Sequence, residues 1–465
     1  MIRRVAEILI VGIIMTGVSF AEESDKATRS TMMNEQDISK STIHLISDPA
    51  AWVTWAARSE IEPDFEAKAG GGPNGQPVLM VSSNGNPIAC GCWRRPLPAL
   101  KQGQRYRIEV AFQADGVSIP AHSVWAIVVK GNAGFYNELD YVGEQDGWER
   151  VAAVIEPSKD MDDLSLCLFL AKAANGSVRW SDAQLTNITD VPVKPRTAYL
   201  AAISGKPYKP ASPEDCMDFY CKQLDEIGPK GVDLVCLPEV INTDGVAGDR
   251  SKLAEPIPGP SSKRLAEKAR KYGMYVCASL SEREGDRIYN TGIIIDRSGA
   301  IIGKYRKTHL TISELLLSGK MPGDTYPIFQ TDIGAIGYMI CYDNHYPEVA
   351  RTLAVKGADI IVFSNMGDGR EGGTLWETYI RTRALDNQVH IVAAVNGGRS
   401  CIVSPRGELL DINDKTPGAI ASAHCDLDAS VCDFTGRPIR KRYLRMRRND
   451  TFAPLTGHFW EAKKP

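Results

Sequence analysis

The chain has 465 residues, of which 43% are hydrophobic and 24% are charged, so it has the composition of a soluble globular protein and the length of two domains. Its formal net charge of −3 excludes the strongly basic character typical of nucleic-acid-binding proteins. After the N-terminus no run approaches the roughly 18 apolar residues of a membrane-spanning helix, so we expect no membrane span.

The first 21 residues have the features of a signal peptide. Arg3 and Arg4 precede an apolar run over residues 8–18, and Ser19-Phe20-Ala21 offers a small-x-small cleavage site. The apolar run is too short to span a bilayer. We therefore predict an exported protein, periplasmic or secreted, whose mature chain begins with a polar, disordered linker over residues 22–40.

Residues 41–190 have the pattern of an all-β sandwich. Short alternating runs at 106–112, 124–129 and 164–170 are separated by Gly, Pro and Asn turns. Residues 146–150 and 178–185 resemble the last strands of galactose-binding-like jelly rolls. That resemblance implies a glycan as a second partner, held by exposed aromatic side chains, whereas the alternative is a module that only packs on its neighbour or on a dimer partner. The aromatic candidates are Trp52, Trp55, Trp93 and Trp125.

A Pro-rich linker at 191–196 precedes a region, 197–432, in which strands and helices alternate, as in α/β proteins. One helix is predicted to begin at Ser212-Pro213, because a cap, a proline and two acids stand together there. Another helix covers 261–272 and stops at Gly273, a third begins near Pro347, and a fourth covers 376–385. The predicted strands cover 197–204, 232–239, 274–280, 289–296, 300–305, 335–340, 359–364, 390–396, 400–404 and 421–426.

Three reactive side chains stand at the ends of predicted strands. Cys341 lies where a buried strand turns into a helix, a position in which the helix dipole favours the thiolate. Glu239 and Lys307 each follow a strand, and ligands gather at the carboxyl ends of strands in α/β sheets. Together they form a chemically specific set, since a carboxylate can deprotonate the thiol, a lysine can stabilise negative charge and the thiolate can attack an electrophilic carbon.

The segments around these residues resemble the three signature blocks of the carbon–nitrogen hydrolase (nitrilase) superfamily, in the family's order. The blocks are Leu-Pro-Glu at 237–239, Lys-Tyr-Arg-Lys-Thr-His at 304–309 and Ile-Cys-Tyr-Asp-Asn-His-Tyr-Pro-Glu at 340–348. The resemblance extends from about residue 197 to 430 and implies a four-layer αββα sandwich after the jelly-roll module. It implies no cofactor and no metal.

The resemblance also implies a role for each residue. Glu239 is the general base, Lys307 supports the tetrahedral intermediate, and Cys341 forms a thioester after ammonia or an amine leaves. The backbone N–H of Tyr342 helps to form the oxyanion site. Family members carry a second glutamate that orients the substrate, and Glu314 is the candidate because it is the only glutamate between Lys307 and Cys341.

The residues after the cysteine bear on the substrate. True nitrilases of this superfamily tend to have a tryptophan there, whereas Tyr342-Asp-Asn-His-Tyr-Pro is similar to amidases and N-carbamoyl hydrolases. We therefore predict hydrolysis of a small amide or ureido compound. We also predict that the protein is a homodimer or higher oligomer. The alternative is a glycan-binding or scaffold protein whose hydrolase domain is inactive.

Several other sequence patterns do not indicate a catalytic or cofactor-binding site. Residues 367–372 match G-x-G-x-x-G, but no acid stands near Asn396 to hold a ribose, so we predict a loop beside the pocket. The absence of Cys-x-x-Cys and His-Glu-x-x-His runs argues against zinc. Eleven cysteines leave at least one thiol outside any intramolecular disulfide. The basic tail, 433–465, reads as a solvated face or dimer contact, or alternatively as an anion-binding patch.

Overall fold

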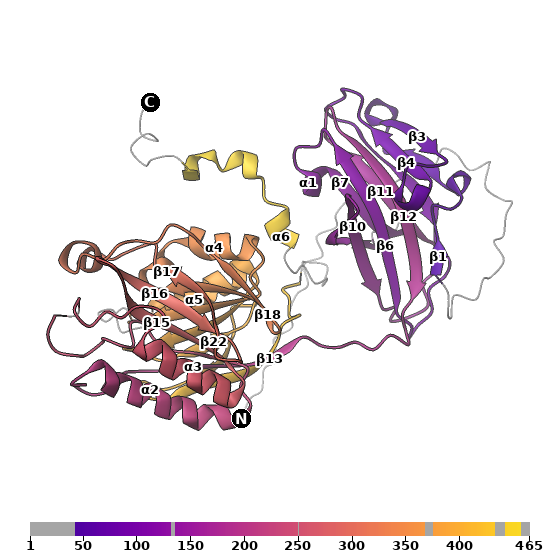
Figure 1. Ribbon diagram of the computed structural model, residues 1–465. Coiled ribbons are helices and arrows are strands. Elements are labelled where there is room, and N and C mark those ends of the chain that lie inside the picture. Colours follow the sequence, from indigo (N-terminus) through magenta and orange to yellow (C-terminus); the bar gives the residue numbers. More distant parts are fainter. Residues whose placement is uncertain (1–41, 132–134, 250, 368–374, 433–441, 457–465) are drawn as a thin grey trace, which may run out of the picture. The chain divides into compact units, whose positions relative to one another are not determined.

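The computed structural model describes residues 42–131, 135–249, 251–367, 375–432 and 442–456 (Figure 1). The chain divides into two compact units, one comprising Val193–Arg447 and the other the residues up to Pro192 together with those from Arg448 onward. The predicted signal peptide and the linker over 22–40 lie outside the described residues. Within the parts of the chain that the structure describes, no helix combines the length and apolar character needed to cross a membrane.

The first unit contains two antiparallel sheets. One has the order β3-β4-β12-β6-β10-β9, with β1 also paired to β12, and the other has the order β2-β5-β11-β7-β8. A short helix, α1 (Pro120–Ser123), precedes β7. The strands are β1 (Thr42–His44), β2 (Val53–Ala56), β3 (Asp64–Lys68), β4 (Val78–Ser82), β5 (Cys90–Pro96), β6 (Tyr106–Asp115), β7 (Val124–Lys130), β8 (Phe135–Glu138), β9 (Asp140–Gln145), β10 (Trp148–Ile155), β11 (Leu164–Ala171) and β12 (Ser177–Asn187).

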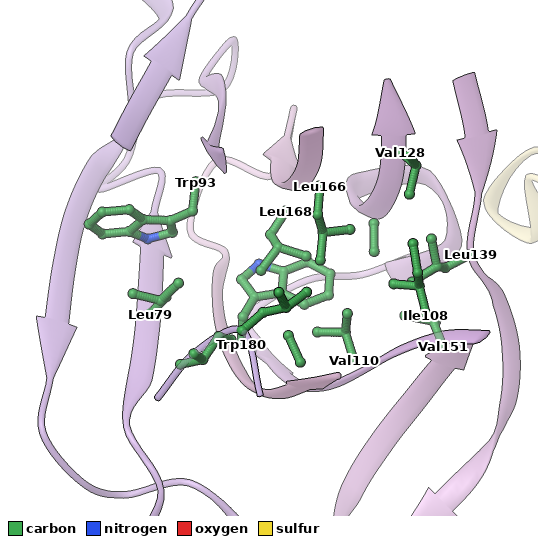
Figure 2. Close-up of a cluster of buried hydrophobic side chains, with 14 of the residues drawn as sticks. Leu79, Trp93, Ile108, Val110, Val128, Leu139, Val151, Leu166, Leu168 and Trp180 are labelled. Carbon is green, nitrogen blue, oxygen red and sulfur yellow. The ribbon is translucent and has the colours of Figure 1, made fainter. Parts of the chain in front are cut away.

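A single large apolar core holds these strands together (Figure 2). Alternation along each strand sends every second side chain inward, so that Ile108 and Val110 of β6 meet Leu166 and Leu168 of β11. Trp180 is fully buried in this core. Two of the four tryptophans considered as glycan contacts, Trp52 and Trp93, are buried as well, which leaves Trp55 and Trp125 partly exposed.

The second unit has a mixed α/β fold, as expected. Two six-stranded sheets run in the orders β17-β16-β15-β14-β13-β24 and β18-β19-β20-β21-β22-β23. The strands of the first sheet are β13 (Thr197–Ile203), β14 (Leu234–Cys236), β15 (Tyr275–Glu284), β16 (Arg287–Ile295), β17 (Ile301–Arg306) and β24 (Ile420–Asp426). Those of the second are β18 (Ile328–Thr331), β19 (Gly334–Ile340), β20 (Ile360–Asn365), β21 (His390–Val395), β22 (Cys401–Val403) and β23 (Leu409–Ile412).

Helices cover one face of each sheet of this unit (Figure 1). The first sheet packs against α2 (Pro213–Ile227) and α3 (Pro260–Tyr272), and the second against α4 (Pro347–Val355) and α5 (Leu375–Asn387). A third apolar cluster is built from residues of both sheets, including Cys236 and Ile294 of one and Ile336 and Val362 of the other. The ends of the strands in both sheets can therefore contribute to one site.

Local sequence signals explain where the helices begin and end. The Ser212 hydroxyl accepts the backbone N–H of Asp215 at 3.2 Å and caps α2, which has Pro213 in its first turn. The α3 helix ends at Gly273, whose φ of 62° is the left-handed conformation that glycine adopts without a steric penalty. Both ends agree with the predictions.

Other expectations need correction. Only Leu234–Cys236, which form β14, are in strand conformation within the predicted strand over 232–239. Pro238 has no N–H to donate to a neighbouring strand, and the chain leaves the sheet before Glu239. Cys341 opens a 3₁₀ turn, Cys341–His345, and α4 begins only at Pro347. The short edge strands β18 and β23 were not predicted. Leu444 of α6 (Arg442–Arg445) packs into the core of the second unit, and residues 433–441 of the predicted basic tail lie outside the described residues.

Candidate active site

The buried strand β19 delivers Cys341 to a tight elbow. The residue has a φ of 46°, in the left-handed region that side-chain-bearing residues rarely adopt. The turn that follows is held by Asp343, whose Oδ2 accepts the backbone N–H of Ile340 at 2.9 Å. Asp343 is fully buried, and its Oδ1 accepts the backbone N–H of His309 at 3.1 Å. The elbow is thereby fixed to the loop that follows Lys307.

Glu239 lies on a second strained turn. The next residue, Val240, is β-branched and has a φ of 43°, an uncommon conformation that costs free energy and clusters at functional sites. Its backbone N–H donates to Ser279 Oγ at 3.0 Å. The Glu239 side chain is only 2% exposed.

Lys307 joins the two glutamates. Its Nζ lies 2.9 Å from Glu239 Oε1 and 2.7 Å from Glu314 Oε2, and the residue is 1% exposed. Glu314 lies on a short π-helical turn, Ser313–Leu317, and also accepts the backbone N–H of Thr311 at 3.1 Å. The structure thus brings together Glu239, Lys307 and Glu314.

These side chains line one cavity of about 320 Å³, which also contains the Cys341 thiol. Gly367, the described end of the G-x-G-x-x-G stretch, borders it, and residues 368–372 lie outside the described residues. The remaining lining includes several polar side chains and the apolar residues Val240, Ile288 and Met366. Six hydroxyl side chains line the cavity: Thr243, Ser251, Ser281, Thr311, Ser313 and Ser318.

Burial, more than the charges in the cavity, disfavours the thiolate form of Cys341. Burial raises the pKa of the Cys341 thiol, the negative charge of Glu239 raises it further, and the opposing charge of Lys307 does not restore it. The expectation that the helix dipole would favour the thiolate is therefore wrong for the resting site. The 3₁₀ turn separates Cys341 from the start of α4, and a dipole acts only within its own first turn. The thiol needs a base.

The two flanking groups are held in their charged forms. Burial alone would lower the pKa of Lys307, but the carboxylates of Glu239 and Glu314 outweigh it and raise that pKa. Burial would raise the pKa of Glu314, but the charge and hydrogen bond of Lys307 lower it to about 2. Of the two oxygens of Glu239, Oε1 accepts from Lys307 and Asn290, whereas Oε2 is buried and has no N–H or O–H donor among the described residues. A hydrogen bond between Glu239 and the Cys341 thiol contributes to the raised pKa of that thiol.

Two further residues of the site were not predicted. Asn290 donates to both glutamates, and a polar residue in the middle of a buried strand was the sequence signal that could have revealed it. Lys320 lines the cavity with its Nζ 3.6 Å from Glu314 Oε1, and burial lowers its pKa. Tyr342, which was predicted, follows Cys341 in the 3₁₀ turn, where its ring packs against His345 and Tyr346.

The part of the chain that carries this site has known relatives. Residues 200–430 match the model of the carbon-nitrogen hydrolase family. The omega-amidase NIT2 of Xenopus tropicalis is 32% identical over 253 residues, which cover 50% of this chain and 89% of the relative. The chain belongs to the carbon-nitrogen hydrolase family. The human omega-amidase NIT2 is 31% identical over 265 residues, which cover 53% of this chain and 91% of that protein.

The fold of this carbon-nitrogen hydrolase region also has a solved counterpart. A carbon-nitrogen hydrolase from Helicobacter pylori G27 aligns with a TM-score of 0.50 and 24% identity, covering 57% of this chain and 99% of that one. The family and its amidase relatives support hydrolysis of carbon–nitrogen bonds in amides. Among the described residues, no group of three or more His, Cys, Asp or Glu side chains is placed to hold a metal ion.

Proposed function

We propose that this chain hydrolyses the carbon–nitrogen bond of a small amide or N-carbamoyl compound through a thioester on Cys341. The observation that carries the proposal is the unfilled oxygen of Glu239. A buried carboxylate normally has hydrogen bonds to both oxygens, but Oε2 has none here, in a cavity whose other reactive group is a neutral thiol. That arrangement suits an oxygen that receives a proton during the reaction.

In the proposed first half-reaction, Glu239 takes the proton of the Cys341 thiol while the sulfur attacks the carbonyl carbon. The carbon–oxygen π pair moves to oxygen, where the charge of Lys307 and the backbone N–H of Tyr342 stabilise it. Collapse of this intermediate breaks the carbon–nitrogen bond. The leaving nitrogen takes the proton from Glu239 and departs as ammonia or an amine.

In the second half-reaction, water attacks the thioester and gives a proton to Glu239. The new tetrahedral intermediate expels the sulfur, which recovers its proton from Glu239, and the carboxylic or carbamic acid leaves. Glu314 also contacts Lys307 and lines the cavity, and we assign to it the orientation of the substrate nitrogen. A cavity of about 320 Å³ with six hydroxyls suits a small, polar substrate.

A panel of small amides, N-carbamoyl compounds and nitriles, with ammonia release as the readout, tests this function. The wild type should release ammonia from an amide or ureido compound, and Cys341→Ala should lower the rate at least about 1,000-fold. Mass spectrometry of the quenched wild type should show an acyl adduct on Cys341. Equal rates in the two proteins would overturn the mechanism, and no turnover of any compound would favour the inactive-scaffold alternative.

We propose the four-layer αββα arrangement for residues 197–432 and a jelly roll for residues 41–190, joined by the linker at 191–196. The shared apolar cluster of the two sheets, with helices on their other faces, supports the first assignment. Two antiparallel sheets around one core support the second. We retain a homodimer or higher oligomer as a proposal, which light scattering on the purified protein tests.

Export also stays a proposal. N-terminal sequencing of the protein from its native host should give a chain that begins at Glu22, because the cleavage site ends at Ala21. An intact Met1 on protein recovered from the cytosol would exclude it.

Glycan binding by the first unit is a second candidate function, and one observation favours it. On the five-stranded sheet, Trp55 pairs with Cys92, Cys92 with Phe169, and Phe169 with Trp125, so these side chains form a row across four strands. The row points away from the core that Trp93, Leu168 and Ala126 enter, and its three aromatic residues are partly exposed whereas Cys92 is buried. Trp55→Ala and Trp125→Ala should weaken retention on immobilised polysaccharides, and unchanged retention would exclude this face.

A further inference from the structure

A single side-chain amide contacts both glutamates of the site. Asn290 Nδ2 lies 2.7 Å from Glu239 Oε1 and 2.8 Å from Glu314 Oε1, so each of its two hydrogens is donated to a different carboxylate. The residue is only 1% exposed and comes from the middle of β16. Its backbone carbonyl also accepts the N–H of Lys307 at 2.9 Å. One residue therefore contacts both carboxylates of the site through its side chain and the backbone N–H of Lys307 through its carbonyl.

The orientation of this amide is fixed from behind. The Val240 N–H donates to Ser279 Oγ, so the Ser279 hydroxyl is free to donate its own hydrogen. That hydrogen goes to Asn290 Oδ1 at a distance of 2.7 Å. With Oδ1 held as an acceptor, Nδ2 is directed toward the two glutamates. The strained turn after Glu239 and the amide that contacts Glu239 thus belong to one hydrogen-bond chain.

We propose that Asn290 is a positioning residue that holds Glu239 and Glu314 as carboxylates and confines the catalytic proton to Oε2 of Glu239, with Ser279 setting its orientation. Oε1 of Glu239 already accepts from Asn290 and Lys307, so a proton on that oxygen would face two donors. Oε2 has no partner among the described residues and is the oxygen that can be protonated at low cost. This inference rests on the proposed function, since it assigns the site of a proton that Cys341 gives up.

The test compares Asn290→Ala, Asn290→Asp and Ser279→Ala with the wild type. Asn290→Ala should lower kcat roughly 10- to 100-fold and move the acidic limb of the kcat/KM profile to higher pH, because hydrogen bonds to a carboxylate favour its charged form. Asn290→Asp places a third carboxylate between the glutamates and should lose more activity. Ser279→Ala keeps the amide, so its loss should be smaller, with the limb moved in the same direction.

Asn387→Ala is the matched control, because Asn387 is fully buried in α5 and donates to the Arg383 carbonyl rather than to the site. It should lower the thermal midpoint without moving the pH profile. A folded Asn290→Ala with wild-type kcat and pH profile would overturn the inference while leaving the proposed function intact. Should Asn290→Ala fail to fold, an unmoved acidic limb in Ser279→Ala overturns it instead. A wild type that releases no ammonia from any compound would overturn both the proposed function and this inference.

Discussion

Two buried glutamates, one within a strand of the first sheet and one in the turn after a neighbouring strand, differ in how many of their oxygens are hydrogen-bonded. Glu282, on β15, is 1% exposed and has two donors on each oxygen. Oε1 accepts from Lys304 Nζ at 2.6 Å and from Arg306 at 3.1 Å, and Oε2 accepts from Thr291 Oγ1 at 2.6 Å and from Arg306 at 3.0 Å. Burial would raise the pKa of Glu282, but Arg306 and Lys304 outweigh it and lower that pKa.

Glu239 is equally buried but only half satisfied. Its Oε1 has two donors, Lys307 and Asn290, whereas Oε2 has none among the described residues. A carboxylate that accepts hydrogen bonds on both oxygens stabilises the fold. Protonation of either oxygen would break at least one of those hydrogen bonds. The comparison teaches that the oxygen without a donor, rather than burial or charge, distinguishes the proposed general base from the structural carboxylate.

The largest expected effect comes from Glu239→Gln. The glutamine carbonyl can replace Oε1 as the acceptor for Lys307 and Asn290, but the side chain can no longer take a proton. We expect kcat to fall by about 10²- to 10⁴-fold, the usual contribution of a general base, with little change in the thermal midpoint. Steady-state kinetics and calorimetry on the same preparation check both parts. Retained activity would mean that another group removes the thiol proton.

Glu282→Gln should lower the stability of the fold and leave the activity unchanged, the reverse of the effect expected for Glu239→Gln. It leaves Lys304 and Arg306 beside a neutral side chain and should lower the free energy of unfolding by about 2 kcal/mol. Activity per folded molecule should stay near that of the wild type, because Glu282 does not line the cavity. Denaturant unfolding with active-site titration of Cys341 separates the two quantities. A loss of kcat at full folding would place Glu282 in the catalytic network and weaken the comparison.

A smaller effect should appear at acidic pH. The pKa of Glu314 is lowered from 4.5 to about 2, so its ion pair with Lys307 contributes stability that is fully present above pH 4.5 and is lost as the pH falls through about 2. The stability difference between the wild type and Glu314→Gln should therefore narrow over this window. The control is Glu267→Gln, at an exposed position of α3, which should show no such narrowing. A constant difference for Glu314→Gln would show that the pair forms no part of the native state.

The smallest effect concerns the cysteines. All eleven are free thiols in the structure, with Cys432 exposed, Cys90 and Cys341 partly buried and the other eight buried. An aromatic disulfide reagent should react quickly with one thiol of the native protein and with eleven after denaturation. A bound amide should slow the reaction of Cys341 and not that of Cys90. Fewer than eleven thiols in the denatured, unreduced protein would reveal a disulfide that the structure lacks.

The sequence allowed much of this molecule to be predicted, for local reasons. A cap and a proline placed the start of α2, a glycine placed the end of α3, and apolar runs located the ten strands predicted after residue 196. The three catalytic candidates were recognised because each follows a strand. Lys320 and the bonds of Asn290 could not be predicted, because they depend on which side chains meet after the two sheets assemble. The protonated state of Cys341 was missed because burial, which dominates it, is a tertiary property.

The backbone conformation of Cys341 has an evolutionary consequence. Glycine accepts a φ of 46° without the steric penalty that a cysteine incurs, so Cys341→Gly would remove the penalty along with the nucleophile. In a lineage released from selection for turnover, substitutions to glycine at position 341 would be favoured by stability alone. The cysteine at this elbow therefore carries a backbone penalty that a glycine in the same place would not carry.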